Sequence, residues 1–469
     1  MDTKKTSDVI TPRPYQEAAI KAGLKIKKGK NGIIVAPTGS GKSIIISEII
    51  KRSGKKTIVL QPTKEILEQN LNKMKSYSVQ DIGIFSASMN EKTIGHITYA
   101  TIGTIIKHKE KFAQFEQIIV DECHGVNSKD GQYEDFITSL NLPTIGLTAT
   151  PFRMKYYQNN YGNKEPVVES RFLTRTRPRI FNTICHVTQV PDLFKQGYLC
   201  PVKYNYQNDY DSRKVKNNST GQGYDEKALL KYNTEKSIVE KIAAECRVST
   251  AKHILIFTQF REESEKTIAL LSRTGMICKE VSGETPKKDR ERILEDFKSG
   301  SLEYVVNVGV LTVGFDFPEL DCIMIGRPTK SLSLFYQICG RGLRTSPGKT
   351  HCEIMDFCDN IKRFGEINSF VIEDVSDGKE LWRLKSDRGY LTGVNLLTGK
   401  DLENRSTTTK KEKELSKSGD ILIPFGKHKG SKLKDADLGY LKWCFENFDK
   451  ENKWKKIFES EIKRREVKN

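Results

Sequence analysis

One short segment constrains the fold more than any other part of this sequence. APTGSGKS (residues 36–43) follows the apolar run GIIV and precedes SIIISEIIKR, whose apolar spacing is that of a helix. Its glycines let the backbone turn so that N–H groups face an anion, and the N-terminus of the following helix adds positive potential. A phosphate-binding loop requires this context of strand, loop and helix. The segment therefore predicts an α/β domain that binds ATP, with Lys42 on the β- and γ-phosphates and Ser43 on Mg²⁺.

The alternation of strands and helices extends this prediction to most of the chain. Short β-rich runs such as GIIVAP, KTIVLQP and FEQIIVDE alternate with helical stretches up to residue 150, and the same rhythm restarts near residue 200. Buried strands that alternate with helices favour a parallel sheet covered on both faces. Because 469 residues exceed one compact core, we expect several domains. The predicted α/β fold has two tandem parallel-sheet lobes at 1–180 and 181–375, a connector at 376–419 and a small basic module at 420–469.

An acidic pair follows one of the predicted buried strands. DECH (residues 121–124) comes directly after FEQIIV. A carboxylate pair in such a place is costly unless it has a function, although an acidic turn that merely ends the strand is the simpler alternative. Beside bound ATP, Asp121 would hold the Mg²⁺ shell, and Glu122 would orient and deprotonate the attacking water.

A predicted helix of the second lobe carries two arginines on one face. SLFYQICGRGLR includes Gln337, Arg341 and Arg344, and its two arginines are three residues apart. Two such guanidiniums could reach the γ-phosphate from the opposite lobe, as arginine fingers do. An isolated R-x-x-R pattern is usually a solvated face, but its position in the second lobe favours the catalytic interpretation. The predicted catalytic residues are Lys42, Asp121, Glu122, Gln337, Arg341 and Arg344.

The composition favours a polyanionic partner and excludes several classes of protein. The 78 Lys and Arg against 60 Asp and Glu give a net charge of +18, and each phosphate that is neutralised releases counterions. No apolar run approaches the roughly 18 residues that span a bilayer, and the N-terminus lacks the apolar stretch of a signal peptide. His351, Cys352 and Cys358 lack the spacing of a zinc site, and no two cysteines form a C-x-x-C pair. We expect a soluble cytoplasmic protein with no membrane contact, no zinc and no metal other than Mg²⁺.

Three segments outside the predicted lobes are basic or polar. Residues 153–180 contain seven Lys or Arg and two acids, with aromatic residues interleaved. Such a pattern suits phosphates and stacked bases, although a solvated connector fits equally well. Residues 405–419 have the composition of a flexible linker. Residues 406–469 contain 17 basic and 11 acidic residues, so the C-terminal module is either a nucleic-acid-holding accessory or a packing cap.

The motifs and their order resemble those of superfamily 2 helicases of the DEAD/DEAH-box kind, over about residues 10–365. That family has two RecA-like lobes and hydrolyses ATP between them. The matching segments, besides those above, are RPYQ (13–16), VLQPTKEILEQ (59–69), YATIGT (99–104), TAT (148–150), ILIFTQF (254–260) and VGVLTVGFDFP (308–318).

The resemblance implies roles for individual residues, with Gln16 on the adenine base and Ser43 and Asp121 on Mg²⁺. The implied ATP contacts are Arg13, Gln16, Pro37, Thr38, Gly39, Ser40, Gly41, Lys42, Ser43, Gly314 and Asp316. The implied nucleic-acid contacts are Pro62, Thr63, Thr101, Thr258 and Thr312. The residues that couple hydrolysis to strand binding are His124, Thr148 and Thr150.

Further segments resemble one branch of this superfamily. GLTATPFR, FKQGYLCP (194–201) and CGRGLRTSPGKTHCEIMDFCDNIKRFG (339–365) are similar to phage UvsW-type branch-migration helicases, bacterial RadD and type III restriction translocases. DEAD-box RNA helicases match less well, since they have SAT where this chain has TAT. A RadD-like zinc tail and a nuclease segment are absent from the sequence.

This resemblance implies an ATP-dependent helicase or translocase. Its substrate would be branched DNA, single- or double-stranded around forks and junctions, in recombination, repair or replication. We expect a monomer, in the host cytoplasm if the chain is of phage origin. An RNA helicase, the motor subunit of a restriction complex and a non-catalytic nucleic-acid clamp are alternatives, and the intact catalytic set argues against the clamp.

Overall fold

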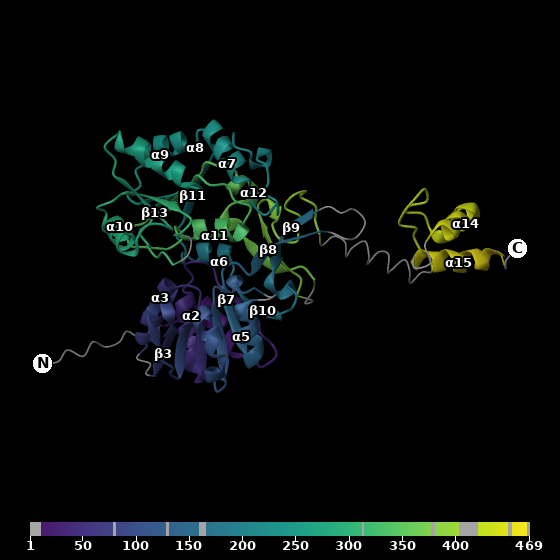
Figure 1. Cartoon of the computed structure of the whole chain (residues 1–469), viewed down its shortest axis with the longest axis horizontal. Helices are drawn as coiled ribbons and strands as arrows, with labels where there is room; N and C mark the ends of the chain where they lie inside the picture. Colours follow the sequence, from purple (N-terminus) through teal and green to yellow (C-terminus); the bar gives the residue numbers. More distant parts are fainter. Residues whose placement is uncertain are drawn as a thin grey trace. The chain divides into compact units, whose positions relative to one another are not determined.

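The predicted α/β class is confirmed by the computed structural model. It describes residues 11–77, 81–127, 131–158, 166–311, 314–376, 380–402, 421–448 and 453–466. The chain divides into two compact units, residues 1–399 and 400–469, and the first contains both RecA-like lobes (Figure 1). Within the described ranges, the helices are too short or too polar to cross a bilayer.

The first lobe is built on one eight-stranded sheet. Its strands are β1 (Gly32–Val35), β2 (Thr57–Gln61), β3 (Ile82–Ser86), β4 (Glu91–Lys92), β5 (Ile97–Thr101), β6 (Gln117–Asp121), β7 (Thr144–Thr148) and β10 (Thr183–Val187), in the order β10-β1-β7-β6-β2-β5-β3-β4. Only the β3–β4 pair is antiparallel. The helices are α1 (Pro14–Leu24), α2 (Lys42–Ser53), α3 (Lys64–Lys75), α4 (Ile102–Ile105) and α5 (Gln132–Leu140). Strands β1, β2, β6 and β7 are buried throughout, as their near-continuous Ile, Val and Leu predict.

The predicted boundary of the first lobe at residue 180 is too early. β10 pairs with β1 in parallel, so the first sheet takes up residues 183–187 before the chain leaves through α6 (Val190–Lys195). The predicted basic connector is an antiparallel hairpin of β8 (Phe152–Gln158) and β9 (Pro166–Phe172). Its buried residues include Phe152, Val168 and Phe172, while Arg153 and Arg171 are half-buried.

The second lobe has a six-stranded sheet in which every neighbouring pair is parallel. Its strands are β11 (Val202–Tyr206), β12 (Ile254–Phe257), β13 (Cys278–Ser282), β14 (Tyr304–Val308), β15 (Cys322–Ile325) and β16 (Cys352–Asp356), in the order β11-β16-β15-β12-β14-β13. The helices are α7 (Glu226–Glu235), α8 (Ile238–Val248), α9 (Arg261–Ser272), α10 (Lys287–Ser299), α11 (Leu332–Gly340) and α12 (Asn360–Phe364).

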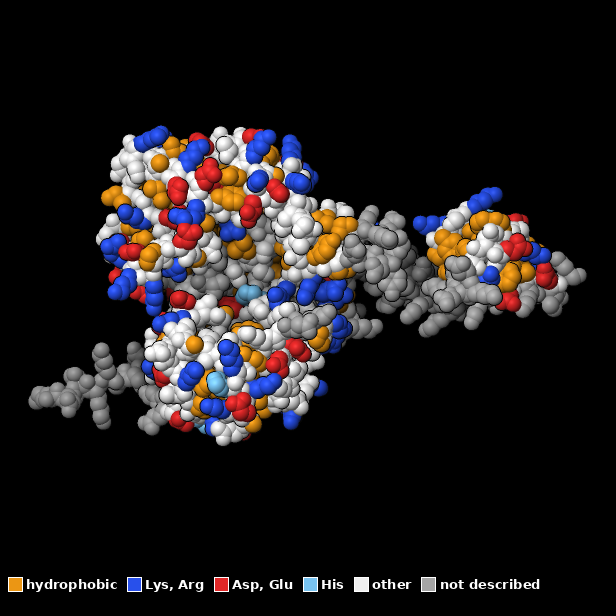
Figure 2. All heavy atoms as spheres, viewed as in Figure 1, with side chains coloured by type: hydrophobic (Ala, Val, Ile, Leu, Met, Phe, Trp, Pro, Cys, Tyr) orange, Lys and Arg blue, Asp and Glu red, His pale blue; other side chains and the backbone are white. Residues whose placement is uncertain are grey.

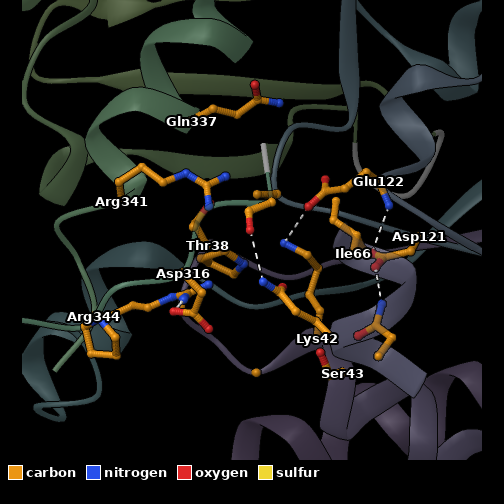
Figure 3. Close-up of a pocket in the computed structure, with 18 of the residues that line it drawn as sticks. Thr38, Lys42, Ser43, Ile66, Asp121, Glu122, Asp316, Gln337, Arg341 and Arg344 are labelled. Atoms are coloured by element: carbon orange, nitrogen blue, oxygen red, sulfur yellow. Dashed lines mark hydrogen bonds and ion pairs between the residues drawn. The ribbon is translucent and has the colours of Figure 1, made fainter. Parts of the chain in front are cut away.

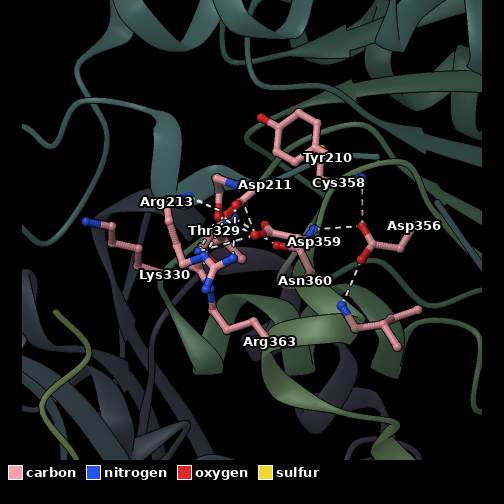
Figure 4. A network of polar contacts seen from close by, with 12 residues as sticks. Tyr210, Asp211, Arg213, Thr329, Lys330, Asp356, Cys358, Asp359, Asn360 and Arg363 are labelled. Atoms are coloured by element: carbon pink, nitrogen blue, oxygen red, sulfur yellow. Dashed lines mark hydrogen bonds and ion pairs between the residues drawn. The ribbon is translucent and has the colours of Figure 1, made fainter. Parts of the chain in front are cut away.

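A network of hydrogen bonds lies at the C-terminal end of β16 in this lobe (Figure 4). Asp356 accepts hydrogen bonds from Cys358 N at 3.2 Å, Asn360 Nδ2 at 2.9 Å and Ile361 N at 2.7 Å. Burial raises the pKa of Asp356 to about 6, although these donors oppose the rise. Asp359 accepts from the backbone N and the hydroxyl of Ser212 at 3.0 and 2.6 Å, which joins a distant loop to the network.

Within the described residues, the predicted connector at 376–419 contains regular secondary structure. β17 (Val371–Asp374), β18 (Trp382–Ser386) and β19 (Gly389–Tyr390) form a small antiparallel sheet. The chain then returns to the hairpin, where Leu396 N donates to Val168 O at 2.7 Å. The linker predicted at 405–419 lies outside the described residues.

The C-terminal unit has a core of its own. It contains α14 (Leu438–Asn447) and α15 (Lys453–Glu466). Its buried residues are Ile423, Leu433, Ala436, Leu441, Cys444, Phe458 and Ile462. Arg465 Nη1 donates to Ala436 O at 2.7 Å, which fixes α15 to the preceding loop.

Candidate active site

Both lobes line one pocket above the phosphate-binding loop (Figure 3). The loop leaves β1 at Val35 and enters α2 at Lys42, with Gly39 and Gly41 at φ +82° and +79°. Only glycine adopts this left-handed backbone readily. The pocket has a volume of about 330 Å³. It is lined from the first lobe by Arg13, Pro37, Thr38, Gly39, Gly41, Lys42, Ser43, Ile66, Gln69, Asn70, Asp121, Glu122, Ala149 and Thr150, and otherwise by Tyr198, Gly314, Asp316, Pro318, Gln337, Arg341, Arg344 and Thr345.

Lys42 and Glu122 face one another across this pocket. Lys42 Nζ lies 3.0 Å from Glu122 Oε1, and both side chains are mostly buried. Burial by itself would raise the pKa of Glu122, but the charge of Lys42 and the contact with His124 hold it below its usual range. Glu122 therefore stays a carboxylate, which is the form that accepts a proton.

Asp121 at the end of β6 is held in place but keeps acceptor capacity. It accepts from Asn70 Nδ2 at 2.7 Å and from Glu122 N at 2.9 Å. Burial raises its pKa to about 6, and the neighbouring Glu122 adds to the rise. Glu122 itself has φ +48°, an uncommon backbone for a non-glycine residue that is stabilised only by its surroundings.

A chain of hydrogen bonds leads from Glu122 to the second lobe. His124 Nδ1 lies 3.2 Å from Glu122 Oε2 and 2.9 Å from the Thr148 hydroxyl. Gln337 Nε2 lies 3.1 Å from His124 Nε2, so a donating amide places the ring proton on Nδ1. Thr150 N donates to the same Thr148 hydroxyl at 3.0 Å. The structure thus brings the three predicted coupling residues together with Gln337.

The two arginines enter the pocket from the C-terminal end of α11. The helix ends at Gly340, so the helix predicted through residue 344 is too long. Gly340 lies against Thr38, where a Cβ would come within 2.8 Å of the Thr38 Cβ. This close approach requires a glycine, and glycine weakens the helix at the same place.

Their guanidiniums nevertheless point into the pocket. Arg341 Nη1 donates to Phe315 O at 2.5 Å, and Arg344 forms an ion pair with Asp316. Burial lowers the pKa of each arginine to about 10, so both stay charged near neutral pH. Gly314 also lines the pocket, and its carbonyl accepts from Gln69 Nε2 of the first lobe at 3.0 Å.

Of the residues predicted to contact the adenine base, Arg13 lines the pocket whereas Gln16 packs against the phosphate-binding loop. Arg13 lines the pocket, and its guanidinium lies over the Tyr198 ring at 4.4 Å from the centroid. Gln16 is buried against the loop, where Nε2 donates to Ser40 O at 2.8 Å. Ser40 is also buried, and its hydroxyl donates to Pro37 O at 2.7 Å. Gln16 and Ser40 therefore support the loop in this structure.

The predicted strand-contacting residues are spread over both lobes. Pro62 is exposed, and Thr63 and Thr101 are half-buried at the starts of α3 and α4. Thr258 is 1% exposed and its hydroxyl donates to Phe260 O at 3.4 Å, so this side chain does not face solvent. Thr312 lies outside the described residues.

Asn70 and Tyr198 are among the pocket residues that were not predicted from the sequence, and each contacts a predicted one. Asn70 holds Asp121 from α3, and its only sequence signal is its position on the helix that begins in VLQPTKEILEQ. Tyr198 stacks with Arg13 but comes from FKQGYLCP, far along the chain. Neither has a spacing relative to the phosphate loop that a pattern could reveal.

Comparison with known proteins agrees with this geometry. The family model "Type III restriction enzyme, res subunit" matches residues 9–153, and "Helicase conserved C-terminal domain" matches residues 236–346. The chain is 27% identical to the putative ATP-dependent helicase IRC3 of Saccharomyces cerevisiae over 374 residues, which cover 74% of this chain and 51% of the yeast protein. This chain thus spans about half the length of that relative.

Two further proteins are similar over most of this chain. The DNA 3'-5' translocase XPB2 of Sulfurisphaera tokodaii is 26% identical over 366 residues, covering 72% of this chain and 79% of the archaeal protein. A fragment of a putative HsdR subunit of a type I restriction enzyme from Vibrio vulnificus YJ016 has the same fold, with a TM-score of 0.55, 19% identity, and coverage of 76% of this chain and 66% of that one. With both family models matched in order and the motif residues gathered in one pocket, the chain belongs to superfamily 2 of the helicases.

Proposed function

We propose that this chain is an ATP-driven DNA helicase or translocase that hydrolyses ATP between its two lobes. The observation that carries the proposal is the convergence of charged residues from both lobes in one pocket. The first lobe supplies Lys42 and Glu122, 3.0 Å apart, and the second supplies Arg341 and Arg344. Neither lobe alone contains both the base and the arginines that phosphoryl transfer uses.

In this mechanism the chain positions ATP and the attacking water. The backbone N–H groups of the loop and Lys42 hold the phosphates, which frees Glu122 from its ion pair. Glu122 then orients the water and accepts its proton. Arg341 stabilises the charge that develops on the transferred phosphoryl group. The base of ATP is placed against the Arg13–Tyr198 pair, whose flat faces suit stacking.

The pocket also fits Mg²⁺. Ser43 and Asp121 both line it, and their oxygens are the hard ligands that this ion prefers. Ser43 and Asp121 would hold the ion, which would supply positive charge to offset that of the phosphates. Asp121 accepts only two hydrogen bonds in the described structure, which leaves lone pairs for this purpose.

Coupling between hydrolysis and movement is assigned to the chain from Glu122 through His124 to Gln337. The Glu122–His124 link of 3.2 Å lies within the first lobe, and the His124–Gln337 link of 3.1 Å crosses to the second. A change in the partner of Glu122 during hydrolysis would break or reform these links. The lobes would then open or close once for each ATP consumed.

A basic surface beside the β8–β9 hairpin is the proposed DNA track. Arg175, Arg177 and Arg179 line a hollow of about 370 Å³, and the last two are exposed. Figure 2 shows Lys and Arg side chains gathered between the positions of β8 and β10 in Figure 1. On the hairpin, Arg153 and Arg171 are paired residues on opposite strands. Arg171 is already neutralised by an ion pair with Glu169, so the exposed Arg177 and Arg179 carry this part of the proposal.

The favoured substrate is branched DNA, such as forks and junctions, in recombination, repair or replication. The archaeal relative is a DNA translocase by name, which favours DNA over RNA. The segments similar to branch-migration helicases favour a branched form. A restriction-type motor is the alternative, since one of the matching family models describes a restriction subunit.

ATPase rates with different nucleic acids test this function. Rates would be compared with single-stranded DNA, blunt duplex, a fork, a four-way junction and RNA. We expect stimulation by DNA above that by RNA, and unwinding of forks and junctions above that of blunt duplexes. Stimulation by RNA alone would instead identify an RNA helicase, and absence of any ATP hydrolysis would leave a nucleic-acid clamp.

Paired charge variants test the proposed track. Arg177→Gln/Arg179→Gln should leave basal ATPase unchanged, weaken DNA binding and reduce the salt slope by about 1 for each phosphate that the variant no longer neutralises. Lys25→Gln/Lys27→Gln removes the same charge from exposed positions just after α1 and is the matched control. Equal effects of the two variants would show that only overall charge matters.

A further inference from the structure

The C-terminal unit carries the most exposed aromatic side chain among the described residues. Trp443 is 57% exposed. It lies on α14, whose inner face buries Leu441 and Cys444 in the core of the unit. A single exposed apolar side chain is common on proteins. Its meaning therefore depends on what surrounds it.

A basic loop is closed next to this helix. Residues 424–430 (PFGKHKG) lie between Ile423 and Ser431, where Ile423 N donates to Ser431 O at 2.9 Å. Gly430 N also donates to Ile423 O at 2.7 Å. These bonds make a tight loop that displays Lys427 and Lys429, both of which are exposed.

One side chain of α14 clamps this loop to the helix. The Tyr440 hydroxyl donates to Phe425 O at 3.3 Å, and its ring lies 4.6 Å from the ring of His428. Gly426 has φ +66°, and a side chain there would meet the Tyr440 hydroxyl. The sequence PFGKHKG thus needs this glycine both for the turn and for the contact.

The clamp places the lysines and the indole on one surface. Tyr440 and Trp443 are three residues apart on α14, so they are neighbours on the same helix face. Lys427 and Lys429 flank the His428 ring that packs on Tyr440. The indole and the loop that carries the two lysines are therefore both neighbours of Tyr440.

We propose that this surface binds an unpaired stretch of nucleic acid, with a base stacked on Trp443 and the backbone phosphates at Lys427 and Lys429. Stacking on an aromatic ring requires a base whose face is free, which a duplex does not offer. Glu446 lies one turn beyond Trp443 and is exposed. Because a carboxylate repels phosphate, the backbone lies toward the loop and away from the C-terminal end of α14.

The charge balance favours nucleic acid over a protein partner. Residues 421–448 contain five lysines and one histidine against three acids. Aromatic and basic groups together are the pattern of single-strand binding surfaces. The inference relies on the proposed function only for the choice of DNA as the polymer. The surface would hold a strand while the motor acts on it, which raises the local DNA concentration without contributing to the chemistry.

Tryptophan fluorescence of the full-length chain tests the stacking. The chain has three tryptophans, Trp382, Trp443 and Trp454, and the other two are half-buried. An oligodeoxythymidylate of about 15 nucleotides should quench the emission of the exposed indole. Blunt duplex should quench much less. Trp443→Phe should lose the quenching while retaining binding, and Trp443→Ala should weaken binding by about 5- to 150-fold in this module.

Charge variants test the phosphate contacts. Lys427→Gln/Lys429→Gln should reduce the quenching at a given DNA concentration and lower the salt slope by about 1.4, at 0.7 for each single-strand phosphate. Lys25→Gln/Lys27→Gln is the control of equal charge and should leave the quenching unchanged. Circular dichroism and melting temperature should be unaltered in every variant, since all the changed side chains are exposed.

The outcomes separate this inference from the proposed motor function. Quenching that persists in Trp443→Phe, or that duplex produces equally, would overturn the stacking surface even if DNA still stimulates ATPase. Concentration-dependent self-association that Trp443→Ala abolishes would show instead that a second copy covers the indole. Quenching without any DNA-stimulated ATPase would uphold the surface and reject the motor.

Discussion

Each lobe has a buried carboxylate at the end of a parallel strand, and the two carboxylates have different roles. Asp121 ends β6 of the first sheet, and Asp356 ends β16 of the second. Both are buried at strand ends, and burial raises the pKa of each to about 6. Asp356 accepts three hydrogen bonds from its own lobe, whereas Asp121 accepts two and lines the pocket.

The difference is in the number of internal hydrogen bonds that each carboxylate accepts, three for Asp356 and two for Asp121. A buried carboxylate costs free energy unless its lone pairs are used. Asp356 uses them to tie α12 to the sheet, and Asp359 holds the distant loop through Ser212, as Figure 4 shows. Asp121 keeps some for a ligand. Burial and strand position alone therefore do not identify a catalytic carboxylate, but incomplete internal pairing beside a pocket does.

The largest expected effect is a loss of kcat, and it should occur on replacing Arg341 but not Arg363 of the second lobe. Arg341 reaches the pocket, while Arg363 contacts Asp359, Ser212 and the carbonyl of Thr329 within the network. Arg341→Ala should reduce kcat about 10³- to 10⁵-fold with a smaller change in ATP affinity. Arg363→Ala should leave kcat unchanged at a temperature where the variant is folded. Steady-state ATPase assays on both variants measure this, and a loss confined to affinity would contradict the role of Arg341 as a finger.

The next effect concerns the base beside Asp121. Glu122→Gln should lower kcat about 10²- to 10⁴-fold, because a general base contributes that much, while ATP still binds. Asp356→Asn at the corresponding strand end should keep the wild-type rate per folded molecule. Fluorescent ATP binding and single-turnover hydrolysis distinguish binding from chemistry. A wild-type rate in Glu122→Gln would remove it from the mechanism.

The sequence predicted the first of these sites better than the second. The phosphate loop, DECH and the two arginines are short motifs, so their residues were identified without knowledge of the fold. The alternation in HCEIMDF (351–357) indicates a strand but not the network at its end, because the donors of Asp356 are largely backbone N–H groups that no pattern of side chains reveals. β10 and the sheet of residues 371–390 were missed for a related reason. Their partners are set by pairing with distant strands.

For the free energy of unfolding, in contrast to catalysis, Asp356 should matter more than Asp121. Asp356→Ala leaves three buried donors without an acceptor and should lower the free energy of unfolding by about 3–5 kcal/mol. Asp121→Ala leaves only two and also removes its repulsion with Glu122, so its cost should be smaller. Chemical denaturation of both variants at neutral pH measures the difference. Equal losses would mean that Asp121 is as structural as Asp356.

The pH dependence of stability should reveal the raised pKa of Asp356. A folded-state pKa of about 6, against an ordinary value of 3.8, means that the folded protein holds this proton more tightly than the unfolded chain. The resulting stability is complete below pH 3.8 and lost as pH rises through 6. The cost of Asp356→Ala should therefore grow by up to about 3 kcal/mol as pH falls from 6.5 toward 4. A pH-independent cost would show that the carboxyl titrates normally.

The smallest effect is expected from removing the C-terminal unit. All residues named in the active site and the network lie before residue 399, within the first compact unit. Truncation after Asn404 should thus leave basal ATPase and the melting temperature of the first unit nearly unchanged. If the C-terminal unit is instead a packing cap, truncation would expose apolar surface and lower that melting temperature.

In that case truncation would also reduce the stability cost of Asp356→Ala, because the second lobe would already be weakened. Scanning calorimetry of the four proteins, full-length and truncated with and without Asp356→Ala, tests for this non-additivity. Additive costs would place the network and the C-terminal unit in independent parts of the chain, and coupling above about 0.5 kcal/mol would join them.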